Sequence, residues 1–158
     1  MPQLVKGGKY VFGWAGLKKD GLIRMPDKAF EEYKFEMTEK IILMSGSKAS
    51  GGFSINRLHG ILGSKIGQQI IDSIGYLRES RSFKTQRSEI IEVGDRLICW
   101  TILDEKKIIC LSNELIDSLG LKIGSKLLVV RGSGLGPAFI ARGPIYEEAL
   151  KHDDLPAY

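Results

Sequence analysis

Apolar residues in this chain occur in short runs separated by polar or glycine-rich turns. The two most continuous runs are KIILM at 40–44 and KLLVV at 126–130. Runs of this length, bounded by turn residues, are typical of strands buried on both faces. Each run is followed by a glycine-rich loop, SGSKASGGFSIN at 45–56 and RGSGLGPAFIARGP at 131–144. The pattern therefore predicts two equivalent strand–loop segments.

An internal repeat accounts for this equivalence. Shifting the chain by 86 positions aligns residues 4–56 with 90–142 without a gap, and eight of the 53 aligned positions are identical. The apolar runs also fall in register, which is stronger support than the identities. The identical pairs are Gly8/Gly94, Trp14/Trp100, Leu17/Leu103, Ile23/Ile109, Lys40/Lys126, Gly46/Gly132, Ser47/Ser133 and Phe53/Phe139. We infer that the chain contains a duplication.

Each copy reads as strand, strand, short helix, strand and strand. Polar turns, LKKDG and LDEKK, follow the first strands, so each copy's first two strands are expected to form a hairpin. Pro26 suits the first turn of one helix, and Ser112 is the expected N-cap of the other. Gly120 is expected to end the second helix. Because both helices are barely two turns long, they must dock on a sheet.

The predicted organisation is a first unit at 1–56, a helical and basic linker at 57–89, and a second unit with a C-terminal helix at 90–158. The linker combines an apolar stripe with a run of basic residues, and the C-terminal helix is expected after Pro144.

The glycine loops raise the question of a phosphate site. A dinucleotide-binding loop needs a third glycine followed by a helix, but Pro137 stands at that position and a strand-like AFIAR follows. The lysine of the other common phosphate loop is also missing. Turns between paired strands are the favoured interpretation, and a phosphate site is the less favoured alternative.

Composition adds an uneven charge. The net charge is +4; residues 1–56 hold nine Lys/Arg and six Asp/Glu, whereas residues 90–158 hold eight and ten. A polyanion would therefore face the first unit and the linker. The chain shows neither a membrane-length apolar run nor a signal-like start, which favours a cytoplasmic protein without a membrane partner.

The run DGLIRMPDKAFEEYKFEMTEKIIL resembles the looped-hinge, swapped-hairpin family of AbrB/SpoVT-type transition-state regulators. Gly21 and Pro26 match that family's spacing, and LSNELIDSLGLKIGSKLLVV at 111–130 is similar to its later half. In that family two chains exchange hairpins to close one barrel that binds DNA. The resemblance implies a mainly β fold with short helices. Two fused β-β-α-β-β units would form one pseudo-twofold, swapped-hairpin-like β-barrel.

The resemblance and the charge together favour a DNA-binding transcriptional regulator. The expected phosphate contacts are Lys18, Lys19, Arg24, Lys28, Arg78, Arg81, Lys84 and Arg87. The family's own arginine positions carry other residues here, namely Leu22, Ile108, Phe30, Glu31, Ile116 and Asp117. That departure leaves open a protein-interaction or small-ligand-binding module, with a shallow pocket near Gly51–Gly52 and 134–136. Double-stranded DNA, a protein partner and a second copy of the chain all stay open as partners.

Other chemistry is not favoured by the sequence. The two histidines, His59 and His152, have no neighbouring nucleophile pattern, so no enzyme activity, metal site or cofactor is expected. Trp14 and Trp100 have two interpretations, as stacking platforms for bases or as matched core residues, and the second is favoured.

Overall fold

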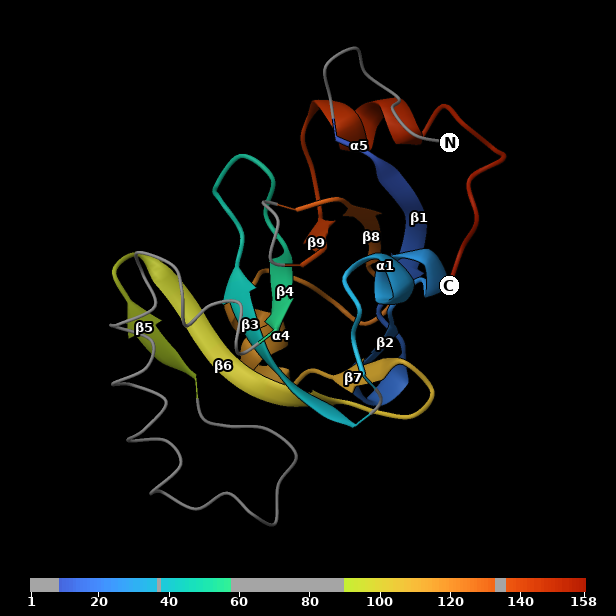
Figure 1. Cartoon of the computed structure of the whole chain (residues 1–158). Coiled ribbons are helices and arrows are strands. Elements are labelled where there is room, and N and C mark those ends of the chain that lie inside the picture. Colours follow the sequence, from blue (N-terminus) through green and yellow to red (C-terminus); the bar gives the residue numbers. More distant parts are fainter. Residues whose placement is uncertain (1–8, 37, 58–89, 133–135) are drawn as a thin grey trace.

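The computed structural model describes residues 9–36, 38–57, 90–132 and 136–158 (Figure 1). The predicted linker helix and most of the linker lie outside the described residues. The fold is mainly β, with short helices, and its elements follow the predicted order in both units. The first unit contains β1 (Val11–Gly16), β2 (Leu22–Arg24), α1 (Asp27–Glu32), β3 (Glu39–Ser45) and β4 (Phe53–Arg57). The second contains β6 (Arg96–Leu103), β7 (Ile108–Cys110), α4 (Asn113–Ser118), β8 (Lys126–Val130) and β9 (Ala138–Ile140).

Three further elements complete the described fold. They are the 3-10 turn η1 (Lys19–Gly21), strand β5 (Ile91–Val93) and the C-terminal helix α5 (Pro144–Ala149). The capping predictions hold for the second helix: Ser112 Oγ accepts a hydrogen bond from the Leu115 N–H at 3.1 Å, and Gly120 follows the helix with a φ of 70°. None of the helices among the described residues is long and apolar enough to span a bilayer.

The larger sheet pairs strands of one unit with strands of the other. Its seven described strands are antiparallel and run in the order β1-β8-β9-β4-β3-β6-β5. Hairpins β3–β4 and β8–β9 stay within their units, but β1 pairs with β8 and β6 pairs with β3. Trp14 lies opposite Leu128, and Trp100 lies opposite Ile42. Both pairs are related by the same 86-residue shift, so the register is pseudo-twofold.

The expectation that each unit's first two strands form a hairpin is wrong. Instead β2 pairs with β7 in a separate two-stranded sheet, with Ile23 opposite Ile109 (Figure 1). Both edges of β1 are already occupied, which is the physical reason. One edge pairs with β8, and on the other edge the Trp14 N–H donates to Pro156 O while the Tyr158 N–H donates to Trp14 O.

The described strands do not close into the predicted barrel. The order of the larger sheet begins at β1 and ends at β5. The C-terminal segment pairs with the outer edge of β1 at Trp14, and β5 pairs with the first three residues of β6.

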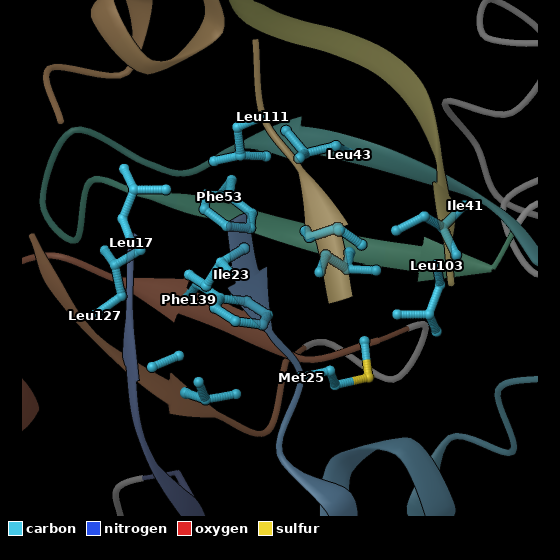
Figure 2. Close-up of a cluster of buried hydrophobic side chains, with 14 of the residues drawn as sticks. Leu17, Ile23, Met25, Ile41, Leu43, Phe53, Leu103, Leu111, Leu127 and Phe139 are labelled. Carbon is cyan, nitrogen blue, oxygen red and sulfur yellow. The ribbon is translucent and has the colours of Figure 1, made fainter. Parts of the chain in front are cut away.

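The core lies between the two sheets and is built from both units. Phe53 and Phe139 stack in its centre with ring centroids 4.8 Å apart and an interplanar angle of 12°. Figure 2 shows these two rings surrounded by apolar side chains of both units, including Ile23, Leu17 and Leu103. The Phe53–Phe139 stack and the Ile23–Ile109 pair each join equivalent positions of the two units. Both pairs therefore lie on the pseudo-twofold axis.

The tryptophans are buried apolar side chains, as the favoured interpretation held, but they belong to two smaller apolar clusters and not to the one between the sheets. Trp14 is 4% exposed and Trp100 is 7% exposed. Trp14 packs beneath α5 with an edge-on contact to Tyr146 at 5.2 Å. Lys126 Nζ lies 4.0 Å from the Trp14 ring centroid, and its equivalent, Lys40 Nζ, lies 4.3 Å from that of Trp100. The duplication has therefore kept this cation–π pair in both units.

Two candidate binding surfaces

The first candidate surface surrounds the β1–β2 connection and α1, where four of the predicted DNA contacts lie. Lys18, Lys19 and Lys28 are exposed, and Arg24 is partly exposed at the end of β2. We call these four residues the first-unit basic surface. The other four predicted contacts, Arg78, Arg81, Lys84 and Arg87, lie outside the described residues.

Arg24 is held by an acidic neighbour. Its Nη2 lies 3.0 Å from Asp27 Oδ1, and Lys107 Nζ from the other unit lies 2.9 Å from the same oxygen. The hydrogen bond from Lys107 is the main cause that lowers the pKa of Asp27 below its ordinary value of 3.8, and the Lys107 and Arg24 charges add to it. Asp27 therefore stays ionised at neutral pH and offsets part of the charge of Arg24.

The equivalent surface of the second unit is acidic. The counterparts of Lys18, Lys19 and Lys28 are Asp104, Glu105 and Glu114. Asp104 also builds its turn, because its Oδ1 accepts the N–H groups of Lys106 at 2.8 Å and Ile108 at 2.9 Å. The two units thus share a fold at this surface but present opposite charges.

The glycine-rich loops link antiparallel strand pairs, as the sequence favoured, and described glycines of both loops pack closely against the other unit. The loops connect β3 with β4 and β8 with β9, both antiparallel pairs. A Cβ atom on Gly52 would lie 1.9 Å from Phe139 O, and one on Gly136 would lie 1.6 Å from Ile55 O. Close backbone approach between the units therefore explains these two glycines.

The second candidate surface is a cavity of about 180 Å³ between the same loops. Its lining combines two cations with polar side chains and glycines. The residues are Lys9, Gly46, Ser47, Ser50, Gly51, Phe53, Ser54, Asn56, Arg96, Gly132, Gly136, Ala138 and Ile140. The sequence indicated a shallow pocket near these glycines but missed Lys9 and Arg96. No local signal identifies these two cations, because Lys9 only precedes β1 and Arg96 only begins β6. The pairing of strands between the units brings both side chains to the loops.

Metal chemistry finds no support in the described part of the chain. No group of three or more His, Cys, Asp or Glu side chains is arranged there to hold an ion. His152 has two acidic neighbours, with Nε2 3.4 Å from Glu148 Oε1 and Nδ1 4.0 Å from Asp154 Oδ1. These contacts place the His152 ring beside two carboxylates just after α5.

No protein-family model matches the chain, and no curated protein matches it significantly.

Proposed function

We propose that this protein is a DNA-binding transcriptional regulator similar to the AbrB/SpoVT-type family, with both halves of the swapped-hairpin fold in one chain. The supporting observation is the exchange of β1 and β6 between the units. In the resembling family, two chains make such an exchange. A duplicated chain supplies both partners itself, so DNA binding does not depend on dimerisation.

The first-unit basic surface is the proposed contact with the DNA backbone. Three exposed lysines lie on η1 and α1 or beside η1, where they can face phosphates, and Arg24 of β2 lies beside them in its pair with Asp27. The basic run at 78–87 supplies a second group of phosphate contacts. Because the second unit carries acids at the equivalent positions, DNA contacts one side of the pseudo-twofold axis.

Binding to random duplex DNA at low and moderate salt tests this function. Fluorescence anisotropy of a labelled duplex should show affinity that falls steeply with salt, with a slope of about 0.9 log units per phosphate contact. The double variant Lys18→Ala/Lys19→Ala should lower this slope by about two. A control with the same charge change, Lys122→Ala/Lys151→Ala, removes two exposed lysines from elsewhere and should leave the slope nearly unchanged.

The linker variant Arg78→Ala/Arg81→Ala/Lys84→Ala/Arg87→Ala locates the remaining contacts. We expect it to weaken binding further and to lower the salt slope by up to about four. Absence of DNA binding at the lowest salt would refute the proposed regulator. Unchanged binding in both basic variants would place the contacts elsewhere on the molecule and refute the proposed surface.

The second candidate function is a protein-interaction or small-ligand-binding module that has lost the family's DNA contacts. The ion-paired Arg24 and the acidic second unit favour it, as does the polar cavity between the glycine loops. This candidate predicts no DNA binding at low salt together with saturable binding of a small ligand.

A further inference from the structure

The cavity between the glycine loops lies close to the pseudo-twofold axis, on the outer face of the larger sheet. Ser54 and Asn56 alternate along β4 with the core residues Phe53 and Ile55, so they point away from the core. Loop residues of both units complete the walls, among them Ser47 from one loop and Gly132 from the other. The cavity therefore depends on both units.

Two cations approach this cavity from different units. Lys9 directly precedes the β1 region, and Arg96 begins β6. The Arg96 guanidinium is oriented by a 2.8 Å hydrogen bond from Nη1 to Ser45 O. Asp95 Oδ1 lies 3.9 Å from Arg96 Nε, but its side chain is 98% exposed, so solvent screens this pair strongly. The Arg96 guanidinium can therefore still attract an anionic ligand, because Asp95 offsets its charge only weakly.

The neutral groups of the lining are side-chain hydroxyls and one buried amide. Ser47 Oγ and Ser50 Oγ lie 2.9 Å apart, and Asn56 Nδ2 donates to Ser54 Oγ at 3.1 Å. Asn56 is only 6% exposed. Serine hydroxyls rotate and can donate to an oxyanion. The backbone is less useful, because the N–H groups of Gly46 and Gly51 already donate to Gly52 O and Ser47 O.

We propose that this cavity binds a small phosphate-bearing molecule through Lys9, Arg96 and the serine hydroxyls. A phosphate monoester carries close to two negative charges at neutral pH and three strong acceptor oxygens. Two cations and several hydroxyl donors match that charge and that number of acceptors. Arginine also pairs with phosphate oxygens through two parallel N–H donors. The cavity of about 180 Å³ leaves room for a small organic group beside the phosphate.

This inference deepens the second candidate function but does not depend on the loss of DNA binding. The cavity shares no residue with the first-unit basic surface, so a free phosphate ligand and duplex DNA can bind to one molecule. Either activity can fail without the other.

Titration of the ¹⁵N-labelled full chain with inorganic phosphate, followed by amide chemical shifts, tests the site. The amides of Gly46, Gly51 and Gly132 should shift along saturating curves, and a sodium chloride titration at equal ionic strength should not reproduce them. Lys9→Gln and Arg96→Gln should each raise the dissociation constant at least about tenfold. Lys48→Gln is the matched control, because Lys48 is an exposed cation of the same loop that does not line the cavity.

Four results would overturn the inference. One is a set of shifts that sodium chloride reproduces; another is unchanged affinity in Lys9→Gln, which keeps the Arg96–Ser45 contact intact. Equal binding of acetate would assign the cavity to carboxylates instead of phosphates. A short duplex that shifts these amides when inorganic phosphate does not would assign them to DNA contact and refute a free ligand.

Discussion

The two units share their internal contacts and differ in their surface charge. The Trp14–Lys126 contact between the units recurs as the equivalent Trp100–Lys40 contact, and Phe53 stacks on its own counterpart Phe139. These positions are identical in both copies because they build the contacts that join the units. Duplication thus kept the residues that the exchanged pairing needs.

The surfaces of the two units diverged instead. Lys18, Lys19 and Lys28 of the first unit correspond to Asp104, Glu105 and Glu114 of the second. An identical pair of chains would present the same charges on both sides of the axis. The fused chain has no such constraint, so one half can bind a polyanion while the other stabilises the fold or binds another partner.

The largest effect is expected at the Phe53–Phe139 stack. Phe53→Ala and Phe139→Ala should each lower the free energy of unfolding by about 3–5 kcal/mol, because each leaves a cavity in the core. The two losses should agree within about 1 kcal/mol, since the pseudo-twofold axis relates the two rings and both are completely buried. Urea denaturation measures both values. A large loss in one variant and almost none in the other would contradict the equivalence of the units.

Changing the charge of the second unit should strengthen DNA binding. Glu105→Lys/Glu114→Lys gives the exposed second-unit surface two charges of the first-unit kind. Each new phosphate contact should steepen the salt dependence by about 0.9 log units, and the low-salt affinity should rise about tenfold or more. Fluorescence anisotropy across a salt series measures this change. Asp104 is left in place because it holds the turn to Ile108. Unchanged affinity and slope would show that the charge difference does not direct DNA to the first unit.

The two cation–π pairs should contribute equally and modestly. Lys126→Met and Lys40→Met remove the charge above Trp14 and Trp100 but keep most of the apolar stem. Each should lower the free energy of unfolding by about 0.5–1 kcal/mol. Double-mutant cycles with Trp→Phe isolate the pairwise energy. A coupling energy in only one of the two pairs would contradict their equivalence.

The smallest effect concerns Asp27, which has no acidic counterpart in the second unit because Asn113 stands there. Its folded pKa is lowered, so its ion pairs favour folding above its ordinary pKa of 3.8, and this contribution is lost as pH falls through the folded value. Asp27→Asn should therefore cost less than about 1 kcal/mol at neutral pH and nothing at the acid end. Urea midpoints at pH 7 and at a pH well below 3.8 measure this difference. A cost independent of pH would show that the pairs with Arg24 and Lys107 are not its source.

The sequence predicted local structure well, because periodicity and turn residues reside in neighbouring positions. The β-β-α-β-β order, the Ser112 cap and the glycine turns follow from such signals. Strand partners do not follow from local signals. A hairpin of β1 and β2 fits the local pattern, yet β1 pairs with β8 and β2 pairs with β7. That choice depends on which buried faces fit across the whole chain.

The candidate sites show the same limit. Exposure of Lys18, Lys19 and Lys28 follows from their polar surroundings. The pairing of Arg24 with Asp27 is a local i,i+3 contact, whereas Lys107 comes from 80 positions away to share the same carboxylate. Lys9 and Arg96 lie in separate units and line one cavity only because the strands are exchanged.

Cross-strand NOEs test the exchanged pairing most directly. The protein should show backbone NOEs from Trp14 to Leu128 and from Trp100 to Ile42, because these residues lie opposite each other on neighbouring strands. An isotope-filtered experiment on mixed labelled and unlabelled chains should assign these NOEs to a single chain. NOEs from Trp14 to Ile42 and from Trp100 to Leu128 would mean that each unit pairs within itself, and would contradict the account.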